Sequence, residues 1–177
     1  MYKSCYLNRH IYGSVEKTFE GIASTRVKIL NQWVDSQWEQ LEFIAEHISP
    51  SFPEVDLSWL NERLASAPDF SELFVIDMHG TAISSTCNEH VGLNNLASNA
   101  VTQGVKKPFL HGPYIDPMTL KIGPSSSKFH DEVTLMFYQP IEHNGIFYGA
   151  VCGRVPNDVL GDLIQREAGH IYPESGD

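Results

Sequence analysis

Apolar residues in the first third of the chain recur at three- to four-residue spacing, with Glu, Lys, Asp and Gln between them, from about Gly13 to Ser49. This spacing predicts an amphipathic helix about 50 Å long at 1.5 Å per residue. Pro50 and Pro53 follow it and would end it. One face of a 177-residue domain cannot bury so long a helix. We therefore expect one end to act as a stalk or as a surface for a partner helix.

Shorter periodic segments follow. Leucines at helical spacing predict a helix over Asp56–Ala65, with Asp56 or Ser58 as its N-cap. The run ELFVIDMHGTAISST, Glu72–Thr86, reads as strand, turn and strand, because the glycine of its Met-His-Gly segment accepts a positive φ. A further short helix is predicted around Leu96–Thr102.

The last third begins with a proline-rich turn motif, GPYIDPMT, at Gly112–Thr119. Two strands then read VTLMFYQPI from Val133 and FYGAVCGRV from Phe147, joined by a hairpin through His143-Asn144-Gly145. A closing helix is predicted over Asn157–Gly169. Helices that are grouped apart from antiparallel strands indicate an α+β fold.

Composition sets limits on these elements. The chain has 177 residues, enough for one ordinary domain, and 42% of them are hydrophobic, which favours a folded protein. Its net charge is −10, and no cluster of Lys and Arg offers a footprint for nucleic acid.

Cysteines and hydropathy exclude further classes. Cys5, Cys87 and Cys152 are too few and too widely spaced for a disulfide framework or a zinc motif, and no CxxCH run for c-type haem occurs. A Cys87–Cys152 bridge stays open. The sequence contains no run of roughly 18–20 apolar residues, which is the length that a membrane helix needs. Its N-terminus also lacks the apolar core of a signal peptide. The abrupt start and the polar tail YPESGD suggest an excised piece of a longer chain.

The order of these motifs resembles that of Cache domains, the PAS-like extracytoplasmic sensor modules of bacterial methyl-accepting chemotaxis receptors and related membrane kinases and cyclases. The resemblance extends from about Val15 to Leu160 and rests on five segments in this order: the long helix, LFVIDMHGTAISST, GPYIDPMT, VTLMFYQPI and GAVCGRVPNDVL. It implies a five- to six-stranded antiparallel sheet, with the long helix packed across one side and a small-molecule site on its concave face.

The resemblance also implies an organisation and a function. We expect a single domain over residues 1–177, made of a helix at 13–49, a core at 70–160 and a connector at 161–177. It would be the periplasmic ligand-binding domain of a membrane-anchored chemoreceptor, dimeric through its first helix and without a cofactor. The sensor of a histidine kinase or diguanylate cyclase, or a metal- or amine-binding sensor, is the alternative. A second such module after residue 177 is also open.

One position departs from the family pattern. Amino-acid sensors of this family usually carry an aspartate on the last strand, in a context like G-V-V-G-V-D-I, whereas this chain reads GAVCGRV and has Arg154 there. The family's Arg-x-Trp signature for a carboxylate is also not evident in KKPFLHG. Because the guanidinium fork suits a carboxylate, these departures favour a small organic anion as ligand. A structural ion pair of Arg154 with Asp116, Asp131 or Asp158 is the alternative.

Further candidates surround that position. Tyr114 and Asp116 resemble residues of the loop over the family's pocket, although Asp116 also suits a turn cap or a partner for a cation. His111 and His130 precede the pocket strands and would donate to a carboxylate near neutral pH. Alternation places either Met136 and Tyr138 or their neighbours Leu135 and Phe137 toward the pocket, and the polar tip of tyrosine favours the first pair.

The sequence contains no motif for catalysis. Ser125-Ser126-Ser127 and His130-Asp131 lie too close in sequence for a typical triad, and neither G-x-S-x-G nor H-E-x-x-H occurs. We therefore expect a protein that binds without catalysing, and neither catalytic nor metal-ligating residues.

Overall fold

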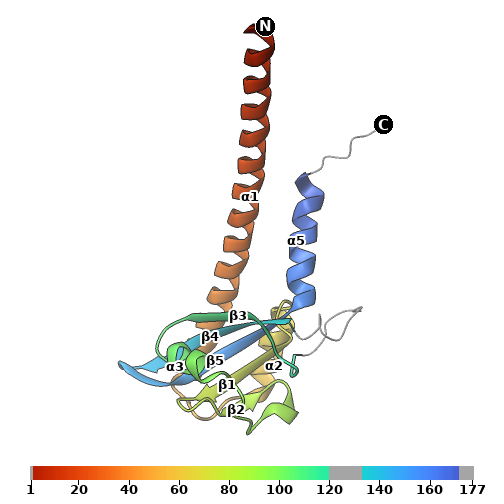
Figure 1. Ribbon diagram of the computed structural model, residues 1–177. Helices are drawn as coiled ribbons and strands as arrows, with labels where there is room; N and C mark the ends of the chain where they lie inside the picture. Colours follow the sequence, from red (N-terminus) through yellow and green to blue (C-terminus); the bar gives the residue numbers. More distant parts are fainter. Residues whose placement is uncertain (1, 120–132, 172–177) are drawn as a thin grey trace. The chain divides into compact units, whose positions relative to one another are not determined.

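The computed structural model describes residues 2–119 and 133–171, and its elements confirm the α+β class (Figure 1). The helices are α1 (Tyr2–Ile48), α2 (Leu57–Ser66), α3 (Ser98–Gly104) and α5 (Asn157–Ile171), with a 3-10 turn, η1, at Asn88–His90. The strands are β1 (Glu72–Asp77), β2 (Ala82–Ser85), β3 (Phe109–Ile115), β4 (Val133–His143) and β5 (Ile146–Pro156).

The chain divides into two compact units. One consists of residues 1–36 and 163–177, which include the first part of α1 and the last part of α5. The other is Gln37–Asp162, which holds the whole sheet. Among the described residues, no helix has the length and apolar character needed to cross a membrane.

Helix α1 is unbroken, as predicted, but it begins at Tyr2 rather than near Gly13. Residues 2–12 contain neither proline nor any other stop signal, and propagating an existing helix costs far less than nucleating one. The predicted second helix is also confirmed, because Asp56 is its N-cap and accepts a hydrogen bond from the Trp59 amide at 3.2 Å. Helix α3 begins two residues later than expected and ends at Gly104.

The five strands form one sheet in the order β2-β1-β5-β4-β3, and every neighbouring pair is antiparallel. The β4–β5 hairpin turns at Asn144 and Gly145, whose φ angles are 52° and 78°, as a tight two-residue turn requires. Gly112–Ile115 of the GPYID segment are not a free turn, as the sequence had suggested, but belong to the edge strand β3, and Asp116 follows the strand. An edge strand tolerates Pro113, and the register shifts between His111 and Tyr114.

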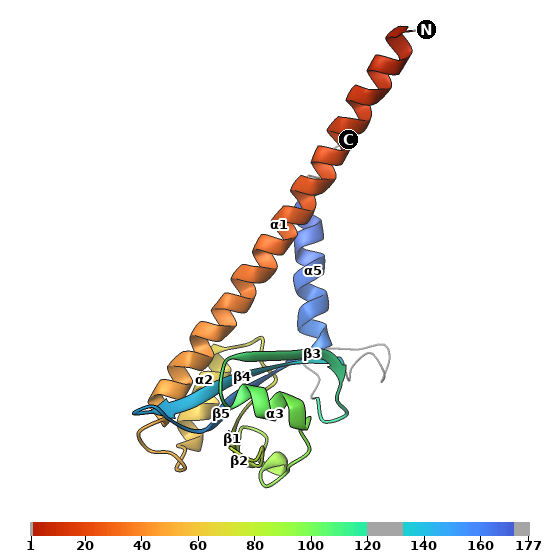
Figure 2. The same ribbon diagram turned by 60° about the vertical axis from the view of Figure 1, so that its left-hand side comes forward.

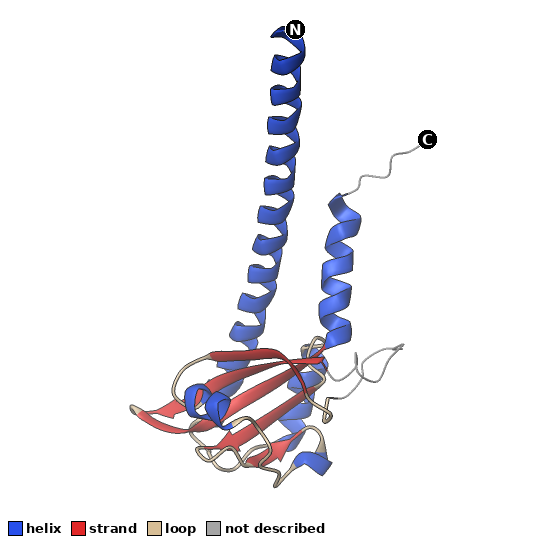
Figure 3. Ribbon diagram, in the orientation of Figure 1, coloured by secondary structure: helices blue, strands red, loops and turns tan. Residues whose placement is uncertain are grey.

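One face of the sheet packs on the last turns of α1. Leu41, Ile44 and Ile48 are buried there, and Trp38 meets Phe137 edge to face with ring centroids 4.9 Å apart. The opposite face packs against α3, which lies over β3 and β4 (Figures 2 and 3). This second face carries a mixed core of apolar and polar side chains, and it holds the candidate site.

Candidate ligand site

Arg154 lies at the centre of the second face and is 3% exposed. In the antiparallel register it stands between Glu72 of β1 and Met136 of β4. Its Nε donates to Glu72 Oε2 at 2.9 Å, and its Nη1 donates to Asp116 Oδ2. Burial opposes its charge, but the carboxylates of Asp116 and Glu72 outweigh that effect and raise the pKa of Arg154. The guanidinium is therefore a buried, permanent cation that the protein itself pairs.

Glu72 is the residue that sequence analysis missed. Its side chain is fully buried and also accepts from Ser85 Oγ at 2.6 Å, while its Oε1 lies 2.8 Å from His90 Nδ1. Three different elements thus supply partners to a single carboxylate. One signal in the sequence could have identified it. Alternation along ELFVID places Glu72 on the same face as Phe74 and Ile76, so a carboxylate on that buried face needs a partner.

Asp116 connects the edge strand to this network. Its Oδ1 accepts from the Met118 amide at 2.9 Å, which caps a turn as the sequence allowed, and its Oδ2 accepts from Tyr114 Oη at 3.2 Å. Burial and the nearby Asp116 charge raise the pKa of Tyr114 well above the ordinary value, so its phenol is neutral. The ion pair of Arg154 with Asp116 confirms one of the structural alternatives for this arginine.

Two threonines complete this side of the network. Arg154 Nη1 donates to Thr119 Oγ1 at 3.4 Å, and that hydroxyl is hydrogen-bonded to Thr134 Oγ1. Thr119 and Thr134 are both buried. Two carboxylates, one guanidinium and several hydroxyls therefore form a continuous polar cluster, which we call the Arg154 cluster: Glu72, Ser85, His90, Tyr114, Asp116, Thr119, Thr134 and Arg154.

A cavity of about 10 Å³, with room for about one water molecule, borders the cluster between the sheet and the segment that precedes α3. Its polar wall is made by Glu72, His90, Asn95 and Arg154. The rest of the wall is apolar and includes Phe74, Ala82, Leu93, Leu96 and Met118. Convergent polar groups in an apolar wall are typical of small-molecule sites, which are usually much larger than this cavity.

The remaining predicted residues fall into two groups. Met136 and Tyr138 lie on the same face as Arg154, in the core cluster with Phe74 and Cys152, whereas Phe137 faces α1.

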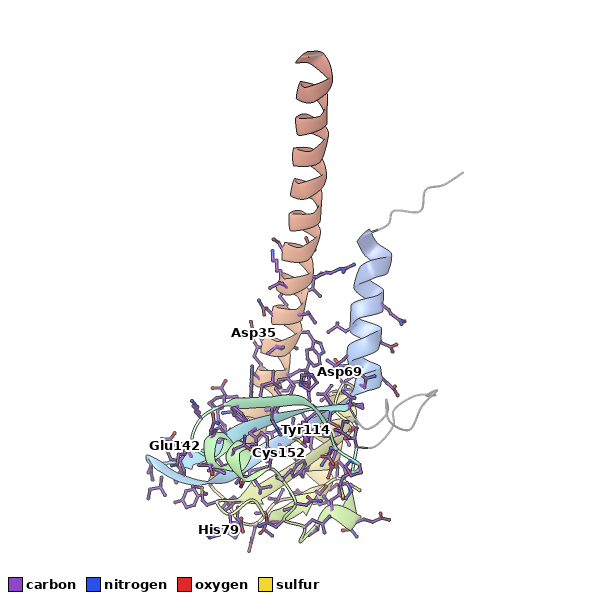
Figure 4. The ribbon with its side chains drawn as sticks, viewed as in Figure 1. Asp35, Asp69, His79, Tyr114, Glu142 and Cys152 are labelled. Carbon is purple, nitrogen blue, oxygen red and sulfur yellow. The ribbon has the colours of Figure 1, made fainter. Side chains whose placement is uncertain are left out.

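His111 stacks on Tyr114 with ring centroids 4.1 Å apart. Burial lowers the pKa of His111, and the negative charge of Asp116 raises it by a smaller amount. Figure 4 labels Tyr114 and Cys152, which come from β3 and β5.

His130 lies outside the described residues, as do Asp131 and the serines at 125–127. Asp158, the third proposed partner of Arg154, belongs to α5, and the structure gives Glu72 and Asp116 to the guanidinium instead. Cys87 and Cys152 are free thiols, so the disulfide that the sequence left open does not form. Among residues 2–119 and 133–171, no group of three or more His, Cys, Asp or Glu is arranged to hold a metal ion.

Solved structures share this architecture. An extracellular ligand-binding receptor from Desulfohalobium retbaense matches 86% of this chain with a TM-score of 0.66 and 16% identity, and the match covers 27% of the receptor. The ligand-binding domain of the Pseudomonas fluorescens chemoreceptor CtaA, in complex with L-valine, matches 78% of this chain with a TM-score of 0.54 and 15% identity. That match covers 60% of the CtaA chain.

No family model and no curated protein matches the sequence. The structural likenesses show that the chain shares the fold of these two ligand-binding receptor domains, and this is the fold that the motif order predicted. The chain spans about a quarter of the first neighbour and 60% of the second.

Proposed function

We propose that this chain is the extracytoplasmic ligand-binding domain of a chemoreceptor and binds a small molecule at the Arg154 cluster. The observation that carries the proposal is a buried, charged cluster beside a small cavity on a covered sheet face. Ligand-binding receptor domains with the same fold support it. The same sensor on a histidine kinase or diguanylate cyclase would use this site in the same way.

The charge of the ligand follows from the cluster. Sequence analysis favoured a carboxylate, because a buried arginine needs an anion. Here Glu72 and Asp116 already supply two carboxylates to one guanidinium, so these three groups together carry one net negative charge. A carboxylate would therefore have to displace Asp116 from Arg154. A ligand with an ammonium group would instead restore neutrality, so we propose an amine, the alternative that the sequence left open.

Three probes with three carbon atoms each separate these possibilities: propylamine, propionate and L-alanine, which carry a cation, an anion and both charges. A ligand that binds the native state raises the melting temperature by mass action. We expect propylamine and L-alanine to raise it and propionate to leave it unchanged. A shift with propionate alone would restore the carboxylate hypothesis, and no shift with any probe would contradict binding of such ligands at this cluster.

Asp116→Asn tests the site itself. It removes one carboxylate that would face the ammonium, so we expect the propylamine shift to be lost. Asp35→Asn is the matched control, because Asp35 is exposed on α1 and belongs to the other compact unit. Equal binding by both variants would place the ligand elsewhere.

Signal output would begin at the same strand. Arg154 is on β5, which runs directly into α5 at Asn157. We propose that this strand and helix have two arrangements and that ligand binding shifts the equilibrium between them. The free energy of that shift cannot exceed the difference between the ligand's binding free energies for the two arrangements. In the parent receptor, α5 would then continue toward the membrane.

We also propose that the receptor dimerises through α1. Val27 and Leu30 are 56% and 36% exposed on a single chain, although both belong to the helix's apolar pattern. Sedimentation at high concentration should show a weak dimer, which Val27→Glu with Leu30→Glu abolishes. A monomer at every concentration would contradict this proposal without affecting the ligand site.

A further inference from the structure

Tyr138 carries a buried polar group that the Arg154 cluster does not use. The residue is 0% exposed, and within the part of the chain that the structure describes its hydroxyl has no hydrogen-bond partner. A buried hydroxyl without a partner is unfavourable, and phenylalanine would fill the same space without that cost. The hydroxyl therefore needs an explanation, such as a water or a ligand.

Packing fixes the direction of this ring. Gly104 of α3 lies against it so closely that a Cβ at Gly104 would stand 2.5 Å from Tyr138 Cβ. Phe109 of β3 lies beside it, with ring centroids 6.3 Å apart. The base of the side chain is thus packed against α3 and its ring against β3, and this packing restricts the direction of the phenol.

The hydroxyl lies on the ligand-site face of the sheet. In the β4–β5 register Tyr138 pairs with Cys152, and the next residue on the same face, Met136, pairs with Arg154. Burial raises the pKa of Tyr138 well above its ordinary value. The phenol is therefore a neutral hydrogen-bond donor.

A second unused atom lies on the neighbouring strand. His111 Nδ1 is buried and has no partner among the described residues. In the β3–β4 register His111 pairs with Met136, which is two residues from Tyr138 along β4 and on the same face. Two adjacent strands thus present one free hydrogen-bonding atom each beside the charged cluster.

From this geometry we infer that Tyr138 and His111 form an uncharged hydrogen-bonding subsite, which takes an oxygen of the ligand, a hydroxyl or a carbonyl, next to its charged group. The inference rests on the proposed function, since it extends the Arg154 site. The Tyr138 phenol donates to the ligand oxygen, and His111 Nδ1 accepts or donates according to its tautomer. The ligand class is therefore a small amine that also carries oxygen.

Ethanolamine and propylamine test this subsite, because they have the same number of heavy atoms and differ by a hydroxyl in place of a methyl group. We expect wild type to bind ethanolamine more tightly than propylamine. Tyr138→Phe should reduce the ratio of the two affinities about tenfold, which is the value of one hydrogen bond in a buried site. Tyr148→Phe is the control: it is half-buried on β5 and packs on Phe52, with ring centroids 5.7 Å apart. It should leave the ratio unchanged.

The ligand-free protein provides a second measurement. If the hydroxyl is reserved for a ligand, Tyr138→Phe removes an uncompensated group and raises the melting temperature by about 2–4 °C for a chain of this size. A lower melting temperature would reveal a structural partner and overturn the inference.

The outcomes separate the inference from the proposed function. Equal binding of propylamine and ethanolamine, or a preference that survives Tyr138→Phe, overturns the subsite while the amine site stands. If neither amine binds wild type, both fail. Loss of the preference in Tyr138→Phe alone supports the subsite.

Discussion

Alternate residues of the same strands build the two faces of the sheet, yet the two faces differ in the charge of the side chains that they bury. Toward α1, Leu73, Val75 and Phe137 are buried, and Phe137 meets the rings of Trp38 and Phe70. None of these side chains is charged, although α1 also buries the uncharged polar residue Gln37. Toward α3, the alternate positions of β1 and β5 hold Glu72 and Arg154.

This difference indicates a division of roles. The α1 face stabilises the fold through apolar contacts, which need no partner of defined geometry. The α3 face holds buried charges, which are weak evidence for stability because desolvation offsets their attraction. It also holds unpaired hydrogen-bonding atoms at Tyr138 and His111. Such groups are expected where a ligand completes the site.

The largest effect should come from breaking the charged face at its centre. Arg154→Ala leaves Glu72 and Asp116 buried without a cation, so we expect it to lower the free energy of unfolding by about 3–5 kcal/mol. Urea denaturation measures this. Arg154→Ala with Glu72→Gln and Asp116→Asn should recover part of the loss, since the uncompensated charges are gone. A loss below about 1 kcal/mol for the single variant would mean that the ion pairs are not formed.

Ser85→Ala removes one neutral donor to Glu72 without changing any charge. A hydrogen bond to a charged group contributes about 1.5–3 kcal/mol, and the Ser85 Oγ to Glu72 Oε1 distance is 2.6 Å. We expect a loss of stability in that range by urea denaturation. Ser84→Ala, on the same strand but only half-buried, is the control and should have little effect. Equal losses would argue that the strand, rather than the carboxylate, is being perturbed.

Two glycines allow the faces to be compared directly. A Cβ at Gly104 would stand 2.5 Å from Tyr138 on the α3 face, and one at Gly153 would stand 2.5 Å from Phe70 on the α1 face. Overpacking of this kind costs about 1–3 kcal/mol, and the better helix propensity of alanine offsets part of it at Gly104. Only Gly104→Ala should also change the affinity for ethanolamine, measured by calorimetry. A similar change in Gly153→Ala would contradict the division of roles.

The smallest effect concerns pH. Burial lowers the pKa of His111 below its ordinary value of 6.5, so the unfolded chain takes up the proton first as the pH falls. Stability should therefore decrease as the pH falls through 6.5. His111→Asn removes this contribution, so its unfolding midpoint should vary less between pH 7.5 and 5.5 than that of wild type. A steeper dependence in the variant would mean that Asp116 dominates instead.

Sequence patterns predicted most of the fold. The helical spacing along α1, the Asp56 cap and the Asn144-Gly145 turn depend on residues close together in the chain, and they were recognisable for that reason. The strand at GPYID was not recognisable from the sequence, because its glycine and prolines are typical of turns. Only its pairing with β4 makes it an edge strand. The placement of Met136 and Tyr138 on the face of Arg154 agrees with the alternation argument, while their role toward a ligand stays a prediction.

The sequence by itself thus determined the order and type of the elements, the α+β class and the place of Arg154 as a lone cation on the last strand. Only the tertiary structure decided what Arg154 contacts, because Glu72 lies 82 residues away in the chain and meets it through the β1–β5 register. The same register decides the net charge of the cluster, and hence which ligand charge it favours. Pattern along one strand indicates which face a side chain takes, but the partner on the next strand depends on long-range pairing.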